Sequence, residues 1–421
     1  MALLIGAIAD DFTGATDLAV TLVNQGMRVT QVIGVPDENT DVGDAQAVVV
    51  ALKSRTNPVG EAVEWSLAAL DWLNTLGVKQ IFFKYCSTFD STSQGNIGPV
   101  SDALLEKLGS EFAVVCPAFP VNGRTVYKGH LFVGELLLSD SSLKDHPLTP
   151  MRDASIVRLM SAQTKRPVGL IDLDTVRKGA AAVSERIGYL KEEKVNYGVI
   201  DAVNDDDLRI IGEAVAGHAL VTGASAVAME LPNNFRRLGI LDAPEKPVLP
   251  KVKGRPVVFA GSCSQATRQQ IAYVKERWPN RKIDADAIAA GEDVGGRLID
   301  WAVRQPEDSP VLIYSSADPE EVAATQKRYG VEAAGQMIER TMGQIATGVA
   351  EQGFNRIIVA GGETSGAVVS SLQLRTLRIG PEIDPGVPWT ESLGDRHLAL
   401  ALKSGNFGSE DFFVKAFEVL K

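Results

Sequence analysis

The sequence predicts an α/β protein of two domains, each with a mostly parallel sheet flanked by helices. Short apolar runs alternate with helical patterns along the chain, and many of these runs end in a polar or glycine-rich turn. Strands that alternate with helices indicate right-handed βαβ crossovers, and therefore parallel pairing. A segment rich in proline and charge interrupts this alternation, which indicates a boundary between two domains.

The interruption spans residues 241–256. Proline-rich segments are stiff and extended and cannot hold a regular element for long, so we expect a linker here. The expected domains are therefore residues 1–240 and residues 257–421. A chain of 421 residues is long enough for about two or three domains.

In the first expected domain, residues 3–9 are apolar throughout, as in a strand buried on both faces. The region 126–150 is irregular and is expected to form a hairpin or a cover over a cleft. Periodic apolar positions indicate a helix after the first strand and helices at 61–76, 97–108 and about 180–191. Further strands are expected at 28–35, 45–52, 80–85, 112–116, 167–171, 197–201 and 219–222.

The strand pattern restarts in the second expected domain, at residues 256–260. Residues 379–388 are rich in proline and glycine and are expected to be a lid or a plain loop. The other predicted elements are strands at 310–314, 355–360 and 398–402, and helices at 266–276, at 335–351 and from 367.

Composition excludes several classes of protein. The net charge of −11 argues against a general affinity for nucleic acid or for anionic membranes. No basic region precedes the first apolar run, so it is not a signal peptide, and no apolar stretch has the length of a membrane span. The three cysteines lack CxxC spacing, which argues against structural zinc and favours a reducing cytoplasm.

The first predicted strand ends abruptly at two adjacent carboxylates, Asp10 and Asp11. Thr13 and Asp17 follow before the first helix is established. In an open α/β sheet, ligands bind at the carboxyl ends of the strands, so these side chains are placed to meet a ligand. In the alternative interpretation, Asp10 and Thr13 only cap the helix and Asp11 faces solvent.

Four successive predicted strands of the first domain end in polar turns, which share one edge if the sheet is parallel. Arginine or lysine there could hold a carboxylate, and acids, amides and hydroxyls could bind sugar hydroxyls. Alternatively, each cation is an ordinary surface charge or ion pair. The candidate substrate-binding residues are Asp10, Thr13, Asp17, Arg55, Lys84, Ser87, Asp90, Asn122 and Arg124.

Three turns of small residues follow strands in the second domain, at 261–264, 361–366 and 404–408. Glycine allows close approach of a ligand, and helix N-termini bind phosphate oxygens. None of the turns matches the P-loop or dinucleotide patterns, but together they favour a nucleotide site. The candidate nucleotide-binding residues are Ser262, Ser264, Gly361, Gly362, Glu363, Thr364 and Gly405.

One domain suited to a polyhydroxy acid and one suited to phosphates suggest phosphoryl transfer across an interdomain cleft. Such transfer requires positioning, charge neutralisation and a group that orients the attacking hydroxyl. Asp11 and Asp10 are the catalytic candidates, because either could accept the hydroxyl proton. Mg²⁺ is expected to bridge phosphate oxygens, with protein ligands that the sequence leaves open.

The chain resembles the four-carbon acid sugar kinase family over nearly its whole length. The resemblance lies in residues 8–17, 52–56, 84–92, 120–125, 261–264, 361–365 and 402–408. It implies an N-terminal sugar-acid domain, a C-terminal ATP domain, and nucleotide contacts at Ser262, at Gly361 through Thr364 and at Gly405. Residues 84–99 and 127–133 are most similar to members that phosphorylate the C4 hydroxyl of 3-oxo-tetronate.

Other functions stay open from the sequence alone. D-threonate, L-threonate or D-erythronate is an alternative substrate for a 4-kinase. A phosphatase or isomerase of phosphorylated sugar acids, or a sensor that binds a sugar acid without turnover, would use the same residue types. The expected partners are a four-carbon sugar acid and a nucleotide, and a homodimer is possible.

Overall fold

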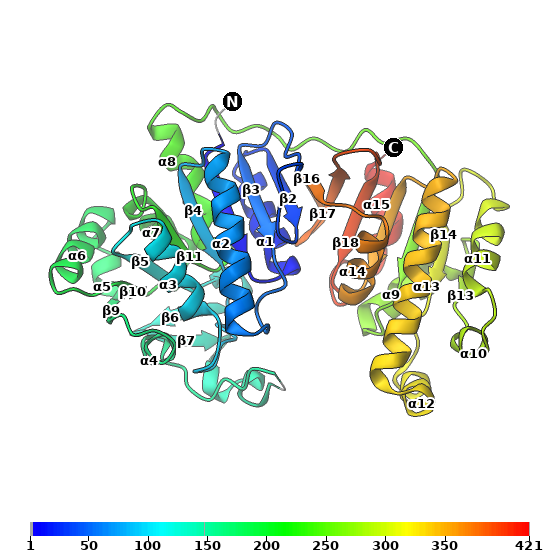
Figure 1. The fold of residues 1–421 in the computed structure, drawn as a ribbon, viewed down its shortest axis with the longest axis horizontal. Coiled ribbons are helices and arrows are strands. Elements are labelled where there is room, and N and C mark those ends of the chain that lie inside the picture. The colour runs from blue at the N-terminus through cyan, green and yellow to red at the C-terminus, as the bar shows by residue number, and fades with distance from the viewer. Residues whose placement is uncertain (1–2, 147, 421) are drawn as a thin grey trace. The chain divides into compact units, whose positions relative to one another are not determined.

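The computed structural model describes residues 3–146 and 148–420 (Figure 1). The chain divides between residues 247 and 248 into two compact units, here called unit 1 and unit 2. This division falls inside the segment 241–256, much of which is exposed and without regular structure. Each unit is described by itself.

Unit 1 is built on parallel strands in the order β2-β3-β1-β4-β11-β5-β10-β9. The central strand β1 pairs in parallel with β3 and β4. All five residues of β1 are buried, which explains its continuous apolar sequence. The strands are β1 (Ile5–Ala9), β2 (Val29–Ile33), β3 (Ala47–Ala51), β4 (Gln80–Lys84), β5 (Ala113–Cys116), β9 (Val168–Ile171), β10 (Tyr197–Ile200) and β11 (Leu220–Gly223).

The helices of unit 1 follow its strands and bury one face each. Helix α7 begins with a capping box, in which Asn204 and Asp207 each bond the other's backbone amide. The helices are α1 (Phe12–Asn24), α2 (Val59–Thr75), α3 (Ile97–Lys107), α4 (Ile156–Ser161), α5 (Leu173–Val176), α6 (Ala180–Glu192), α7 (Asp205–Ala214) and α8 (Leu231–Arg237).

The region predicted as a hairpin or cover forms a small antiparallel sheet of β6 (Arg124–Tyr127), β7 (His130–Val133) and β8 (Leu136–Leu137). The hairpin alternative is therefore confirmed, and residue 147 of that region lies outside the described residues. The buried carboxylate of Asp201 anchors the hairpin turn, because it accepts the amides of Lys128 and Gly129, both at 2.8 Å. Short 3-10 turns follow at Leu138–Asp140 and Ser142–Asp145.

Unit 2 has strands in the order β13-β14-β12-β15-β18-β17-β16. The first five pair in parallel, whereas β17 pairs antiparallel with both of its neighbours. The strands are β12 (Pro256–Ala260), β13 (Asn280–Lys282), β14 (Val311–Tyr314), β15 (Arg356–Ala360), β16 (Thr376–Asp384), β17 (Val387–Ser392) and β18 (Ala399–Lys403). Both units thus have the predicted class, a mostly parallel sheet with helices.

Residues 379–388 are not a plain loop, contrary to one of the two expectations. They lie within the β16–β17 hairpin, whose register shifts between Ile379 and Glu382 and again before Asp384. Proline has no backbone amide to donate, and strands tolerate it at irregularities of this kind. Pro381 therefore does not break the strand. The proline and glycine residues of 379–388 therefore belong to a hairpin with irregular pairing.

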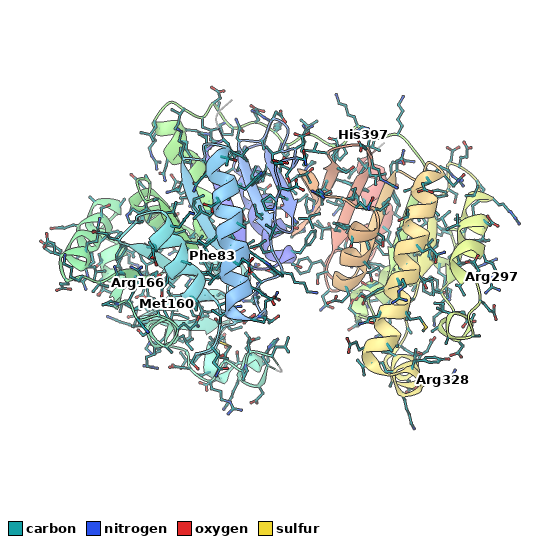
Figure 2. The ribbon with its side chains drawn as sticks, in the orientation of Figure 1. Phe83, Met160, Arg166, Arg297, Arg328 and His397 are labelled. Atoms are coloured by element: carbon teal, nitrogen blue, oxygen red, sulfur yellow. The ribbon has the colours of Figure 1, made fainter. Side chains whose placement is uncertain are left out.

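Several helices of unit 2 pack on this sheet, and Trp389 is fully buried in the same apolar cluster as Phe412 and Phe417. Some exposed arginines pair on the surface, such as Arg297 with Glu292 (Figure 2). The helices are α9 (Gln265–Lys275), α10 (Ala285–Ala289), α11 (Val294–Val303), α12 (Pro319–Tyr329), α13 (Val331–Glu351), α14 (Gly362–Ser371) and α15 (Phe412–Val419).

Two helix starts of unit 2 differ from the prediction by four residues or more, and one of them is α13, which begins at Val331 and not at residue 335. Helix α14 begins at Gly362 and not at residue 367, so most of the expected turn at 361–366 is helical. Gly361 alone makes the turn, with a φ of +134° that favours glycine. Among the described residues, no helix is both long and apolar enough to cross a membrane.

Candidate active site

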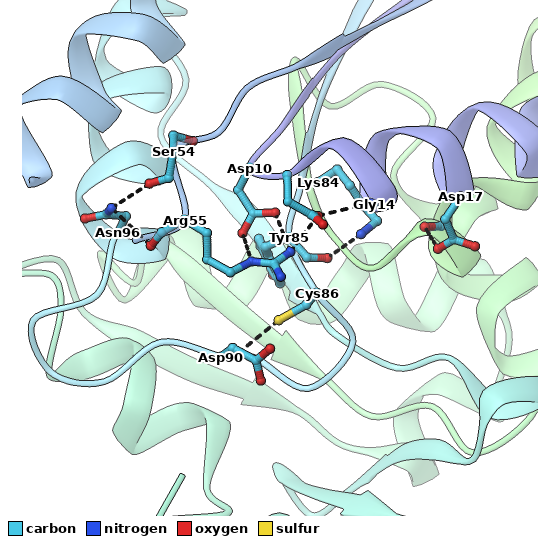
Figure 3. A network of polar contacts seen from close by, with 12 residues as sticks. Asp10, Gly14, Asp17, Ser54, Arg55, Lys84, Tyr85, Cys86, Asp90 and Asn96 are labelled. Carbon is cyan, nitrogen blue, oxygen red and sulfur yellow. Dashed lines mark hydrogen bonds and ion pairs between the residues drawn. The ribbon is translucent and has the colours of Figure 1, made fainter. Parts of the chain in front are cut away.

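The carboxyl ends of three neighbouring strands of unit 1 are tied together at Asp10. The Asp10 amide donates to the Lys84 carbonyl at 3.1 Å, and the Asp10 carbonyl accepts the amides of Ser54 and Arg55 at 3.0 and 3.2 Å. The carboxyl ends of β1, β3 and β4 therefore lie together, as the sequence predicted for a parallel sheet. Figure 3 shows Arg55 reaching from its turn to the Asp10 carboxylate.

Asp10 and Arg55 form a two-pronged ion pair. The Nε of Arg55 lies 2.9 Å from Oδ2 of Asp10, and its Nη2 lies 2.8 Å from Oδ1. The Asp10 side chain is only 6% exposed. Burial raises the pKa of Asp10, and the charge and hydrogen bond of Arg55 act against that rise. The pair holds a buried carboxylate that would be costly without its partner.

Asp11 occupies a different environment from its neighbour. Its Oδ1 accepts Nη2 of Arg55 at 2.6 Å and the amide of Gly14 at 3.1 Å, which makes Asp11 the N-cap of α1. Its side chain is 28% exposed. This reverses the capping alternative, because Asp11 caps the helix and Asp10 is buried. Thr13 lies exposed in the first turn of α1.

Lys84 lies close to the same helix start. Its side chain is buried, and its Nζ donates to the Tyr85 carbonyl at 2.9 Å. A Cβ added to Gly14 would lie 2.8 Å from this Nζ and would collide with Oδ1 of Asp11. The ammonium of Lys84 and the carboxylate of Asp11 therefore both lie close to Gly14, and a side chain there would displace one or both of them.

A second residue holds the turn that carries Arg55. The Nδ2 of Asn96 donates to the carbonyls of Ser54 and Asn57, at 2.8 and 2.9 Å. Asn96, Asp90, Asp10 and Arg55 line a cavity of about 10 Å³, the size of one water molecule. Oδ1 of Asp90 is buried there without a hydrogen-bond partner among the described residues. A four-carbon acid does not fit this cavity.

Other predicted substrate residues lie apart from the Asp10–Arg55 network. Asp17, one turn further along α1, accepts the hydroxyl of Ser225. Arg124 donates to the carbonyl of Asn122, and no hydrogen bond or ion pair within the described ranges joins either residue to Asp10 or Asp11. Ser87 is half-buried in the loop after β4.

In unit 2, the three small-residue turns meet at the ends of β12, β15 and β18. The amide of Gly361 donates to the Lys403 carbonyl at 2.9 Å, and Oγ of Ser264 donates to the Gly405 carbonyl at 2.6 Å. A Cβ on Gly405 would collide with Oγ of Ser262, and one on Gly261 would collide with Oγ1 of Thr364. Glycine is required at these contacts because the turns touch.

The meeting turns carry features that favour an anion. Helix α9 starts at Gln265 and α14 starts at Gly362, so the amide ends of both helices lie at these turns. Oγ of Ser365 is buried without a hydrogen-bond partner in the described part of the chain. Thr364 is buried, whereas Glu363 is exposed and is the single acidic residue in the first turn of α14.

Two family profiles match the chain. A profile described as "Sugar-binding N-terminal domain" matches residues 5–231, and one described as "Nucleotide-binding C-terminal domain" matches residues 257–413. The chain belongs to the four-carbon acid sugar kinase family. The family resemblance stated from the sequence motifs is therefore confirmed.

Relatives within this family cover nearly the whole chain. A 3-oxo-tetronate kinase of Burkholderia multivorans is 53% identical over 418 residues, which are 99% of this chain and 97% of that protein. A 3-oxo-tetronate kinase of Pseudomonas fluorescens is 54% identical over 415 residues, 98% of this chain and 96% of that protein.

Solved structures agree with the fold. A Haemophilus influenzae protein has a TM-score of 0.89 at 44% identity, covering 99% of this chain and 100% of that one. A Salmonella typhimurium protein, described as a putative tRNA synthase, has a TM-score of 0.91 at 44% identity and covers 100% of both chains.

Several residues that bond the site or its candidate residues were not among the sequence candidates. Ser225 acts through a contact with Asp17, which is distant in sequence, so local motifs gave little sign of it, whereas Asn96 lies inside the stretch 84–99 that carries the family resemblance. Thr267 and Lys403 bond the Gly405 turn from α9 and β18. Lys403 had one usable signal, because it ends a strand inside a family motif, as Lys84 does.

Proposed function

We propose that this protein is an ATP-dependent kinase that transfers the γ-phosphoryl group to the C4 hydroxyl of 3-oxo-tetronate. The products are 3-oxo-tetronate 4-phosphate and ADP. The observation that carries the proposal is that relatives called 3-oxo-tetronate kinase match this chain at 53% and 54% identity over nearly its full length. The cation–carboxylate network of unit 1 and the glycine turns of unit 2 support it.

We assign the sugar acid to unit 1 and the nucleotide to unit 2. The descriptions of the two matching profiles support this division. In unit 1 the partly exposed side of the network, at Asp11, is where the acid would bind, because the inner cavity holds only a water. The buried ammonium of Lys84 lies beside Asp11 at the same helix start. In unit 2 the amides at the start of α14 and the hydroxyls of Ser262 and Ser264 would bind phosphate oxygens.

Asp11 is the better candidate for accepting the hydroxyl proton. Its side chain is 28% exposed, whereas that of Asp10 is 6% exposed and is held by two bonds from Arg55. Arg55 donates hydrogen bonds from its Nε and Nη2 to the two aspartates. We therefore propose that Arg55 holds the Asp11 carboxylate in position. Lys84 would then supply the positive charge for the carboxylate of the substrate.

The residues fit a Mg²⁺ ion that arrives with ATP. No group of three or more His, Cys, Asp or Glu side chains within the described ranges could hold a metal ion. Mg²⁺ commonly binds through substrate phosphates, waters and one or two carboxylates, and so needs no larger protein cage. Glu363 is the acid at the phosphate turns that would hold it, and the bound ion would neutralise charge on the phosphate oxygens.

The test is a panel of acids assayed for ADP release with ATP and Mg²⁺. We expect kcat/KM to be highest for 3-oxo-tetronate, with D-threonate, L-threonate and D-erythronate as competitors. If one of those competitors had the highest kcat/KM, the proposed substrate would be wrong but the proposed kinase activity would stand. Absence of ADP with every acid would contradict the kinase, and release of phosphate from a tetronate phosphate would favour a phosphatase. The same preparation, measured by light scattering, tests the expected homodimer.

A further inference from the structure

Lys403 is a buried cation at the end of β18. It is 2% exposed, and its Nζ donates to Oγ1 of Thr267 at 3.1 Å, to the Ser404 carbonyl at 3.0 Å and to the Gly405 carbonyl at 3.2 Å. These partners are all neutral oxygens, and none of the ion pairs within the described ranges involves Lys403. Burial lowers the pKa of Lys403 to about 8, as expected for a cation without a carboxylate partner.

The ammonium lies where the three small-residue turns meet. The Gly405 carbonyl that it bonds also accepts Oγ of Ser264 at 2.6 Å and Oγ1 of Thr267 at 2.8 Å. The backbone carbonyl of Lys403 accepts the amide of Gly361, which precedes α14. The charge of Lys403 therefore adds to the positive ends of α9 and α14.

The folded turn does not depend on this charge for its hydrogen bonds. Two neutral hydroxyls already satisfy the Gly405 carbonyl, and a carbonyl oxygen has two lone pairs. Removing an ammonium from water is unfavourable unless a negative group compensates for the lost hydration. A polyphosphate at these turns would be that negative group.

We propose that the buried charge of Lys403, held by the Ser404 and Gly405 carbonyls, makes the unit 2 turns prefer nucleotides with more phosphates. This inference rests on the proposed nucleotide-binding role of unit 2. It differs from that role in naming the source of selectivity among ATP, ADP and AMP.

The experiment measures the affinities of ATP, ADP and AMP for the full-length protein by displacement of a fluorescent ATP analogue. Lys403→Met is expected to lower the affinity for ATP about tenfold and the affinity for ADP by less, and to leave the affinity for AMP within about twofold. The reason is that the attraction lost with the ammonium grows with the charge of the ligand. Lys403→Arg is expected to restore most of the ATP affinity. Lys253→Met, at an exposed lysine of unit 2, is the matched control and should change nothing.

Thr267→Val distinguishes the effect of the Lys403 charge on nucleotide affinity from the effect of the turn's geometry. It removes a hydroxyl that donates to the Gly405 carbonyl and leaves the Lys403 ammonium in the protein. We expect it to weaken the three nucleotides by similar factors. Equal weakening of ATP, ADP and AMP by Lys403→Met would overturn the inference, since a purely structural role predicts that result. If Lys403→Met does not fold, Lys403→Gln, which keeps a donor without charge, carries the same comparison.

The two proposals fail in different ways. If the unaltered protein binds none of the three nucleotides, the nucleotide role of unit 2 is wrong, and the inference falls with it. If the unaltered protein prefers ATP and Lys403→Met keeps the same preference, only the inference about Lys403 is wrong.

Discussion

Asp10 and Asp11 are neighbours in the chain, but the fold gives them different surroundings. Asp10 ends a buried strand and faces Arg55, whereas Asp11 starts a helix and keeps part of its side chain exposed. A buried carboxylate paired with arginine serves stability, because breaking the pair leaves an uncompensated charge. An exposed carboxylate can meet a ligand, so the same residue type can have two roles here.

Asp11→Asn is expected to lower kcat by about 10²- to 10⁴-fold, the usual contribution of a general base. Asparagine also caps helices well, so the fold and the ATP affinity should be kept. Steady-state kinetics with 3-oxo-tetronate and a binding measurement with ATP test this. A kcat within about twofold of the unaltered enzyme would assign proton transfer to another group.

Asp10→Asn is expected to act mainly on stability. The free energy of unfolding should fall by about 2 kcal/mol. This is less than the loss of a fully buried pair causes, because Arg55 is partly exposed and still has its ion pair with Asp11. Denaturant unfolding measures the change. Asp206→Asn is the control, since Asp206 pairs with Arg209 on the surface and should contribute below about 1 kcal/mol. Equal effects of the two substitutions would show that the buried pair is not special.

At the scale of elements, the starts of α1 and α14 both lie at proposed ligand sites. In α1, Gly14 lies under the Asp11 carboxylate and the Lys84 ammonium. Before α14, Gly361 adopts a left-handed φ and is the single residue between the end of β15 at Ala360 and the start of the helix at Gly362. Each helix start is therefore fixed by a close contact between elements and not only by helix propensity.

Gly14→Ala is expected to lower both stability and kcat, although alanine normally stabilises a helix by roughly 0.5–1 kcal/mol relative to glycine. The reason is the collision with the Asp11 carboxylate. Gly188→Ala in α6 is the matched control, because nothing lies within 4 Å of the added Cβ. Thermal unfolding and kinetics compare the two variants. If Gly14→Ala stabilised the protein as Gly188→Ala should and kept its kcat, the close contact would be refuted.

At the scale of the whole molecule, the two units share one plan. Each has buried parallel strands whose carboxyl ends carry polar or glycine-rich turns, and each ends one strand in a buried lysine, Lys84 or Lys403. The chemical character differs, because the unit 1 turns carry two carboxylates and an arginine, and those of unit 2 carry small residues and helix N-termini. This difference supports the proposed division, in which unit 1 binds the hydroxy acid and unit 2 binds the phosphates.

The three cysteines of the molecule are expected to differ in reactivity. Burial raises the pKa of Cys86 and of Cys116 to about 12, so at pH 8 very little of either is thiolate, whereas Cys263 is exposed. A disulfide reagent at pH 8 should modify one thiol rapidly in the native protein and three after unfolding. ATP should slow the rapid reaction, because Cys263 lies between Ser262 and Ser264. Rapid modification that persists in Cys263→Ser would contradict this assignment.

Much of the fold was predictable because it depends on local patterns. Buried parallel strands read as continuous apolar runs, and the predicted strands of unit 1 agree with the structure to within about two residues at each end. The starts of α13 and α14 were predicted too late, β13 was not predicted, and the region 379–388 was not recognised as a hairpin. At the start of α14 and in 379–388, glycine and proline were taken as the end of regular structure, whereas the chain there is helical or paired.

The sequence by itself determined the alternation of strands and helices, the mostly parallel sheets, the strand ends that carry charge or glycine, and the resemblance to a kinase family. The tertiary structure decided which aspartate is buried, that Arg55 reaches across 45 residues to bind Asp10, and that Lys403 has only neutral partners. The physical reason is that periodicity records the burial of a residue in its own element. Pairing between charges depends on how distant segments pack, which no local pattern encodes.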